Sequence, residues 1–353
     1  MAFDRLPESV QTLYAELLDQ LRAADAEAAV LGLKGTFVSK TIRGRTYWYL
    51  QRSEGESKKQ IYLGAETPAL LRKIELSKAN AEGNGLDEAR RRDLVAMVAA
   101  GGMARESAAI STVMRVLSDA GVFRFGGVLV GTQAFTCLAN LLGVVFEQQT
   151  MRTADIDVAQ DDSIALGLPA AGDGALLQRL RAEEPRFVAV PGFDAGDAST
   201  SFRVRGRDLR VDFLIPAGRG KASRRPVFLP HLGMSAQPLE GLGYLIEDHI
   251  DAAFLGGSGV RVNVPQPARF ALHKLWVASE RPASETAKQR KDLRQAEGLL
   301  SVLLADRPGD LTEAWHALRP GMRGAIRGSL VAVDAEVNRR VREAVAASKK
   351  QSP

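Results

Sequence analysis

Three aspartates inside two apolar, strand-like stretches constrain this chain more than any other feature of its sequence. Asp155 and Asp157 alternate with apolar residues in the stretch 153–159, and Asp212 lies within the apolar run 211–215. In a strand, residues i and i+2 project from the same face, so the first two acids share a face while the residues between them point to a core. Carboxylates that close together repel each other unless a cation lies between them. We therefore expect the two strands to be neighbours and their acids to converge.

The same acids predict a magnesium site. Mg²⁺ takes few protein carboxylates and completes its octahedron with waters and substrate phosphates. Asp155 and Asp157 would hold one ion, and a second ion, at the separation of about 3.5–4 Å typical of two-metal sites, would be shared with Asp212. Mn²⁺ is the alternative metal. A structural interpretation stays open for each acid, because Asp-x-Asp is often a solvated strand end and Asp212 could pair with Arg210 or Arg152.

A Gly-Thr turn at Gly131 and Thr132 is the second part of the candidate site. It follows an apolar strand over residues 125–130 and precedes an apolar helix that we expect from Ala134 to Val145. Glycine allows a close approach of the backbone, and the free N–H groups at a helix start favour phosphate. Because glycine turns are common, this turn points to function only in combination with the acids.

The order of the predicted elements indicates an α+β chain with three regions. An accessory module of residues 1–100 would contain a helix over 5–30, an antiparallel sheet and two further helices, 67–82 and 86–100, separated by a polar, glycine-containing break. The sheet strands are expected at about 36–43, 45–52 and 59–63.

The other two regions are a catalytic domain over 101–265 and a C-terminal helical domain over 266–353. In the catalytic domain we expect helices at 104–120 and 174–183 and strands at 187–191, 200–206 and 208–215. A hairpin would join 242–255 to 260–264, and the last helices would cover 268–281, 284–305, 309–317 and 331–347.

Charge and aromatic content permit a nucleic-acid partner. The net charge is +5, and residues 203–225 contain eight basic residues against two acids. That run is either a solvated face or a polyanion contact. The aromatic residues of the N-terminal strands (Tyr47, Trp48, Tyr49 and Tyr62) are either the core of a small sheet, which their β-propensity favours, or a nucleic-acid surface.

Cysteine content and hydropathy bear on the compartment. The single cysteine, Cys137, allows no internal disulfide and fits a reducing cytoplasm. The N-terminus does not have the pattern of a signal peptide, and no apolar run approaches the roughly 18 residues that span a bilayer, so we expect a cytoplasmic chain without a membrane partner.

Together, the Val-Gly-Thr turn, the apolar helix, the run Arg152-Thr-Ala-Asp155-Ile-Asp157 and the later Asp212 resemble the signature of the DNA polymerase beta nucleotidyltransferase superfamily. The resemblance implies a nucleotidyltransferase fold, a mixed sheet flanked by helices. In that superfamily a Gly-Ser or Gly-Gly turn binds the triphosphate and three aspartates bind two Mg²⁺; here Thr132 takes the second turn position. The spacing is similar to that of bacterial abortive-infection nucleotidyltransferase toxins.

The resemblance continues downstream and covers about residues 122–300. Residues 264–274 and 289–293 look like two helical segments of those toxins, which implies that Lys274 contacts phosphate and that Asp292 supports the site. Gln295 stands where those proteins often carry a second acid. Arg152 would help to offset charge on the leaving pyrophosphate.

The activity that this resemblance implies is metal-dependent transfer of a nucleoside monophosphate from a nucleoside triphosphate to an acceptor hydroxyl. RNA, including tRNA, is the favoured acceptor and protein the other, and a cognate antitoxin is the implied partner. The alternative is a catalytically inactive nucleotide- or RNA-binding module of the same fold.

Overall fold

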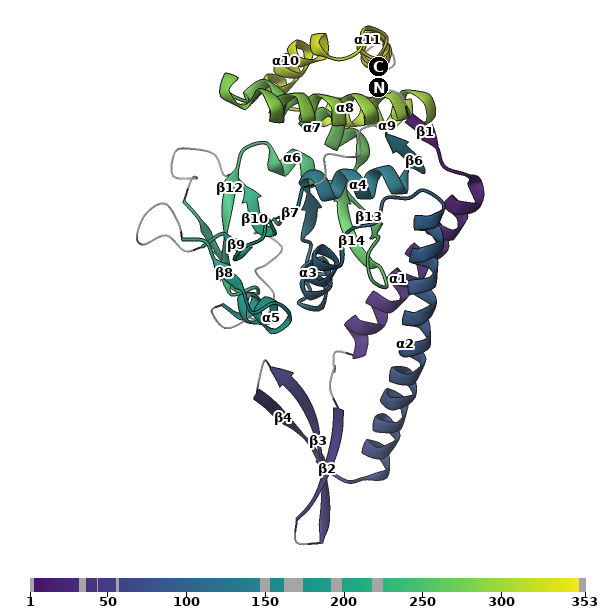
Figure 1. Ribbon diagram of the computed structural model, residues 1–353, viewed down its shortest axis with the longest axis vertical. Coiled ribbons are helices and arrows are strands. Elements are labelled where there is room, and N and C mark those ends of the chain that lie inside the picture. Colours follow the sequence, from purple (N-terminus) through teal and green to yellow (C-terminus); the bar gives the residue numbers. More distant parts are fainter. Residues whose placement is uncertain are drawn as a thin grey trace.

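The computed structural model describes residues 3–31, 36–42, 44–54, 57–146, 153–161, 174–191, 199–217 and 225–348. Its N-terminal part is an arm of two long helices that carries a small sheet away from the rest of the chain (Figure 1). The helices are α1 (Glu8–Leu31) and α2 (Pro68–Ala100). Strands β2 (Thr36–Ile42), β3 (Arg45–Glu54) and β4 (Ser57–Ala65) pair antiparallel in that order, which confirms the predicted three-stranded sheet.

The predicted break between helices at residues 82–86 is wrong, because α2 runs continuously through it. Its start is as expected: Pro68 occupies the first turn, and the Thr67 side chain accepts a hydrogen bond from the backbone N–H of Leu70 at 3.2 Å. A glycine inside a helix costs only about 1 kcal/mol relative to alanine. Two glycines therefore do not end a helix that is capped at one end and buried at the other.

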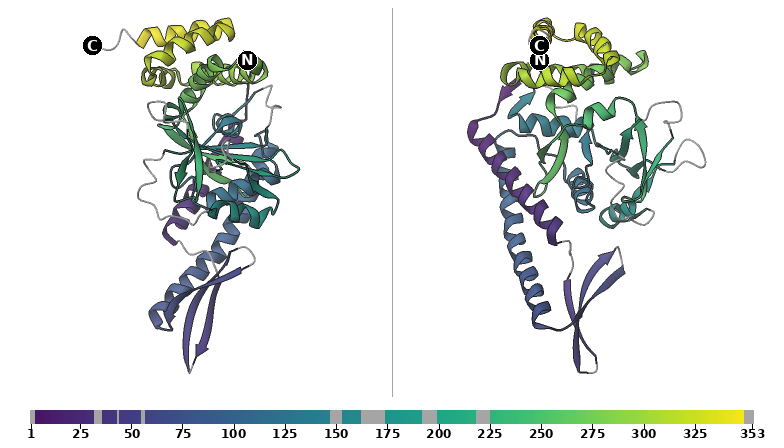
Figure 2. Two further views of the ribbon diagram at one scale, coloured as in Figure 1. Left: turned by 90° about the vertical axis from the view of Figure 1, so that its left-hand side faces the viewer. Right: turned by 180° about the vertical axis from the view of Figure 1, so that it is seen from behind.

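The helical arm is anchored to the central domain by its own hydrophobic core. Leu17, Val95 and Val98 are fully buried there, together with Ala253 and Leu255 from the end of a central hairpin. The Tyr14 hydroxyl accepts a hydrogen bond from the backbone N–H of Ala253 at 3.0 Å. The base of the arm therefore packs against the hairpin of the central domain. The three-stranded sheet lies at the other end of the arm (Figure 2).

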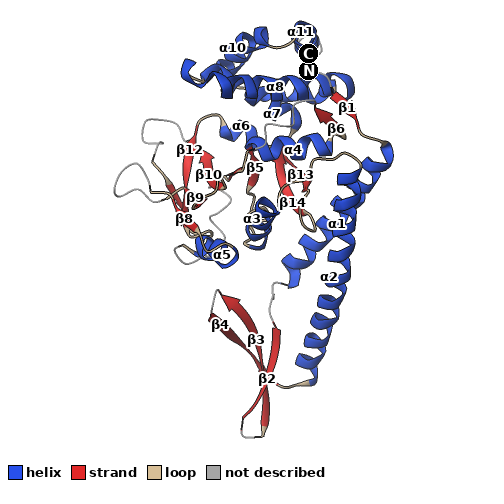
Figure 3. Cartoon of the chain, in the orientation of Figure 1, coloured by secondary structure: helices blue, strands red, loops and turns tan. Residues whose placement is uncertain are grey.

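In the described residues, nine strands form the mixed central sheet, with the main order β11-β12-β10-β7-β5-β14-β13 and with β9 and β8 joined to β10. The strands are β5 (Val128–Val130), β7 (Asp155–Ala159), β8 (Phe187–Ala189), β9 (Ser201–Val204), β10 (Arg210–Pro216), β11 (Val227–Leu229), β12 (Met234–Leu239), β13 (His249–Phe254) and β14 (Val260–Pro265). The helices beside the sheet are α3 (Ala108–Asp119), α4 (Gly131–Leu141), α5 (Ala175–Glu183) and α6 (Leu242–Ile246). This mixed sheet with flanking helices confirms the predicted α+β class (Figure 3).

Helices also form the C-terminal region, as predicted. They are α7 (Pro267–Glu280), α8 (Thr286–Asp306), α9 (Pro308–Ala317), α10 (Pro320–Ser329) and α11 (Ala335–Ser348). Helix α10 was not expected from the sequence. Within the described parts of the chain, no helix has both the length and the apolar character that crossing a membrane requires.

Two further expectations are corrected. The helix predicted from Ala134 to Val145 ends at Leu141, because Gly143 turns the chain with a positive φ of 65° into β6 (Val144–Phe146). That strand pairs with β1 (Phe3–Arg5), a partner about 140 positions away that a local pattern does not reveal. The hairpin predicted from residue 242 starts at His249, because 242–246 are helical, and β11 and β12 were not predicted.

Candidate functional site

The three predicted acids lie on two adjacent parallel strands. In the register of β7 and β10, Asp212 is opposite Asp157 and Arg210 is opposite Asp155. Paired residues of neighbouring strands project from the same face. The residue between the two acids of β7, Ile156, is fully buried on the other face. The structure therefore brings Asp155, Asp157 and Asp212 to one side of the sheet, around the position that the sequence indicated.

The Gly131 turn lies directly against this acid group. Strand β5 pairs antiparallel with β7 on the side away from β10, and Val130 is opposite Asp157. The chain passes from β5 into α4 without a loop, since Gly131 adopts a left-handed φ of 68°. A Cβ atom on Gly131 would overlap the Oδ2 atom of Asp157. Glycine is therefore required here both for the backbone conformation and for the close approach.

We expect Gly131→Ala to lower the free energy of unfolding by about 2 kcal/mol, since backbone strain of about 1–3 kcal/mol adds to the overlap with Asp157. Gly206→Ala is the matched control, because Gly206 has a similar φ of 76° but open space around its Cβ position. Urea denaturation of both variants separates the two contributions. Equal losses would show that the contact with Asp157 carries no cost.

Negative charge at the acid group is only partly compensated. Burial raises the pKa of Asp157 to about 6, with further increases from Asp212 and Asp155, while Lys274 and Arg210 act in the opposite direction. Burial also raises the pKa of Asp155, and the Asp212 carboxylate adds to that effect. A divalent cation would relieve this repulsion.

The donor chemistry fits a hard cation, since all three side chains offer carboxylate oxygens. In the described residues, however, no three His, Cys, Asp or Glu side chains are grouped closely enough to hold a metal ion as they stand. The Asp212 Oδ1 atom instead accepts a hydrogen bond from Arg210 Nε at 2.8 Å, and the same Nε lies 2.8 Å from Ser201 Oγ. A cation would therefore compete with Arg210 for Asp212.

Two lysines approach the acids from the C-terminal helices α7 and α8. Lys291 Nζ donates a hydrogen bond to Thr132 Oγ1 at 2.8 Å, beside the Gly131 turn. Burial lowers the pKa of Lys291, and Lys274 lowers it further, whereas Asp292, Asp155 and Asp157 raise it. Lys291 lies in the segment 289–293 that resembles the toxins, but the resemblance did not imply a contact for it.

Asp292 is a buried counter-ion rather than an open ligand. Its side chain is 3% exposed, and its two oxygens accept hydrogen bonds from Lys274 Nζ and Arg281 Nε, both at 2.7 Å. These bonds hold Lys274 in place beside the site. One turn further along α8, Gln295 is also buried, so an acid at that position would carry the cost of burying a charge.

Some predicted contacts fall outside the part of the chain that the structure describes. Arg152 is one of them, and Arg219, Lys221 and Arg224 of the basic run are others. Their roles therefore stay predictions. The described basic residues of that run are all exposed: Arg203, Arg205, Arg207, Arg210 and Arg225.

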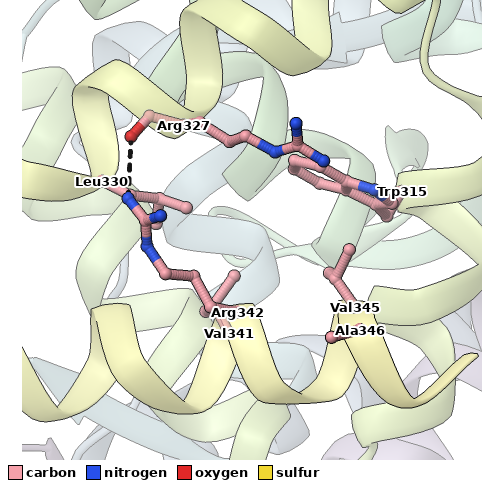
Figure 4. A pocket seen from close by; sticks show the side chains of 7 residues that line it. All are labelled: Trp315, Arg327, Leu330, Val341, Arg342, Val345 and Ala346. Atoms are coloured by element: carbon pink, nitrogen blue, oxygen red, sulfur yellow. Dashed lines mark hydrogen bonds between the residues drawn. The ribbon is translucent and has the colours of Figure 1, made fainter.

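A separate cavity of about 210 Å³ lies in the C-terminal helices and not at the acids (Figure 4). The Arg327 guanidinium lies 5.6 Å from the centre of the Trp315 ring, and Arg342 Nη2 donates to the Arg327 carbonyl at 3.2 Å. Among the described residues, its lining has two guanidinium groups and no carboxylate, which does not suit it to metal-dependent chemistry.

Comparison with known proteins gives two matches along the chain. A family described as "Nucleotidyltransferase" matches residues 108–319, which contain all three acids, the Gly131 turn and both lysines. A domain of unknown function, DUF6788, matches residues 8–73, which cover α1 and the three-stranded sheet. No curated protein and no solved structure matches the chain.

Proposed function

The chain belongs to a nucleotidyltransferase family, and on that premise we propose that it transfers a nucleoside monophosphate from a nucleoside triphosphate to an acceptor hydroxyl. The observation that carries this proposal is the register of Asp157 beside Asp212, with the Gly131 turn against the first of them. Phosphoryl transfer needs positioning and charge stabilisation rather than a covalent intermediate. A glycine turn at a helix start beside three carboxylates on one face of the sheet supports that chemistry.

In the proposed mechanism, Asp155, Asp157 and Asp212 hold Mg²⁺, or Mn²⁺ in its place. When bound, such ions offset charge on the triphosphate and lower the pKa of the acceptor hydroxyl. The backbone amides at the start of α4 receive the triphosphate. The Asp212 carboxylate takes the proton of the acceptor hydroxyl as the new bond to phosphorus forms and pyrophosphate leaves.

Basic side chains would offset charge on the departing pyrophosphate. Lys274, held by Asp292, and Lys291, bound to the Thr132 hydroxyl, are the described candidates, and Arg152 is proposed for the same role. Electrostatic stabilisation of this kind is often the largest contribution to rate, because the charges are fixed before the reaction begins.

Lys291→Met should lower kcat/KM for the nucleoside triphosphate by about 10²-fold, because a preorganised charge at the phosphates is lost. Lys288→Met is the matched control: Lys288 lies one turn earlier on α8 and is exposed, and its partner is Glu285 at 2.9 Å. Steady-state kinetics of both variants decide the assignment. If kcat/KM fell by a similar factor in the two variants, Lys291 would have no specific role at the site.

The acceptor is proposed to be RNA, including tRNA, and a protein acceptor is the alternative. Exposed arginines at the start of the 203–225 run support a polyanion. A cognate antitoxin partner rests on the toxin resemblance alone. The test is incubation with each labelled nucleoside triphosphate, total RNA and cell lysate, with and without EDTA. Label on RNA that disappears with EDTA is expected, and transfer unaffected by EDTA would contradict the metal-dependent mechanism.

A catalytically inactive nucleotide-binding module is the second candidate function. The ion pair of Arg210 with Asp212 favours it, since that pair occupies one of the three acids. Metal-dependent nucleotide binding without release of pyrophosphate in the same incubations would support this candidate and contradict transfer.

A further inference from the structure

One face of the three-stranded sheet carries a group of tyrosines that the proposed chemistry does not use. The antiparallel register pairs Lys40 with Tyr47, and Tyr49 with Tyr62, and residues two apart on a strand share a face. We call the face formed by Lys40, Tyr47, Tyr49, Gln51, Gln60 and Tyr62 the aromatic face. The three-stranded sheet that carries it lies at the far end of the arm, away from the central sheet (Figures 1 and 2).

The tyrosine rings on this face are adjacent but not stacked on each other. The Tyr62 ring centre is 5.5 Å from that of Tyr49 and 6.2 Å from that of Tyr47, with interplanar angles of 58° and 46°. Lys40 Nζ lies 5.1 Å from the Tyr49 ring centre and donates to Gln60 Oε1 at 2.6 Å. The face thus combines aromatic rings, a cation and amide groups.

The start of α2 lies against the opposite face. Gly64, which pairs with Trp48 on that side, is the residue that approaches Leu70 of α2, and Trp48 Nε1 donates to Glu66 at 2.9 Å. On the aromatic face, Tyr62 is 55% exposed. Tyr47 and Tyr49, which lie beside it, are half-buried. Contiguous apolar side chains that remain at a surface mark interaction sites.

Charge in this segment is strongly asymmetric. Residues 36–65 contain six basic residues and two acidic residues. The basic residues are Lys40, Arg43, Arg45, Arg52, Lys58 and Lys59, and the acidic ones are Glu54 and Glu56. The segment that forms the aromatic face therefore carries an excess of positive charge in its sequence, and of its described side chains Lys40 lies on the face itself. Positive charge beside aromatic rings complements a polyanion that also offers flat apolar surfaces.

We propose that the aromatic face binds single-stranded RNA, with one base stacked on the exposed Tyr62 ring and a second on Tyr49, from whose ring Lys40 turns to the phosphates. Unpaired bases expose the ring faces that aromatic side chains stack on, whereas a duplex hides them. Binding needs neither nucleotide nor transfer. Only its further role, holding an acceptor for the acid site, rests on the proposed function. The alternative occupant is a protein partner. The positive charge of this segment favours the phosphates of RNA and gives no reason to prefer a protein.

The test is fluorescence anisotropy of the full chain with a labelled oligouridylate, in EDTA and without nucleoside triphosphate. The Tyr62→Leu and Tyr49→Leu variants should each bind about tenfold more weakly, while Tyr62→Phe and Tyr49→Phe should stay within about twofold of wild type, because the stacking ring is retained. Lys40→Gln should reduce the slope of log affinity against log salt by about 1 between about 50 and 200 mM salt.

Several results would overturn the proposal: no binding by wild type at about 50 mM salt, duplex RNA bound as tightly as single-stranded RNA, or leucine variants that bind like wild type. A phenylalanine variant as weak as its leucine counterpart would do so too. Thermal unfolding of each variant checks its fold, and the exposed Tyr62 position keeps the test valid if Tyr49→Leu unfolds. Because EDTA stops the proposed transfer, failure of catalysis leaves this measurement unaffected.

Discussion

Asp157→Asn is expected to lower nucleotidyl transfer by on the order of 10³-fold or more at saturating nucleoside triphosphate, and Asp212→Asn by a similar factor. Asparagine keeps the shape of the side chain but removes the charge that would hold the cation. Asp157 lies between Gly131 on one side and Asp212 on the other, so a neutral group there affects both the phosphate turn and the metal ligands. Pyrophosphate release and label transfer, each measured with Mg²⁺ and with Mn²⁺, give the rates.

Asp208→Asn is the matched control for both variants. Asp208 is exposed in the turn before β10, four residues from Asp212, and its charge acts on Asp155 from outside the acid group. Removing this charge should leave transfer within about twofold of wild type, since a solvated charge contributes little. Wild-type rates in Asp157→Asn or Asp212→Asn would exclude that residue from the mechanism. Equal losses in all three variants would point to a general effect of charge.

The strand assignments behind this site could be predicted because they depend on local alternation. Ile156 and Val158 are fully buried while Asp155 and Asp157 face the other way, as a period of two requires. Adjacency of Asp212 is a different matter, since parallel pairing joins strands about 55 residues apart. It was expected from the shared chemistry of the acids and from the family resemblance, not from periodicity.

Contacts that depend on the rotation of a helix about its axis or on pairing of distant segments could not be predicted from the sequence. Lys288 and Lys291 lie on the same helix, and only the tertiary placement of α8 decides that the second of them reaches Thr132. The polar segment around Gly83 has turn composition, yet it continues α2, because a glycine inside a helix costs only about 1 kcal/mol and does not by itself end the helix. Strand β6 exists only through its pairing with β1.

Without metal, the same Asp157→Asn substitution is expected to stabilise the fold at neutral pH. The folded pKa of Asp157 is about 6, above the ordinary value of 3.8 that the unfolded chain should have. Below about pH 3 the carboxyl is protonated in both states and contributes nothing. Between about pH 4 and 6 the folded state binds the proton more tightly, so stability falls as pH rises, and above about pH 6 the whole penalty is present. Asparagine carries no such charge.

Urea denaturation in EDTA should therefore find equal stability of wild type and Asp157→Asn near about pH 3, and a more stable variant at about pH 7.5. The difference should reach up to about 3 kcal/mol, since each pKa unit corresponds to about 1.4 kcal/mol. Adding Mg²⁺ should raise the stability of wild type more than that of the variant, because a ligand stabilises the state that binds it. A variant that is less stable than wild type at about pH 7.5 in EDTA would show that the Asp157 charge does not destabilise the fold. If Mg²⁺ left the difference in stability between wild type and variant unchanged, the metal would not bind at the acid group.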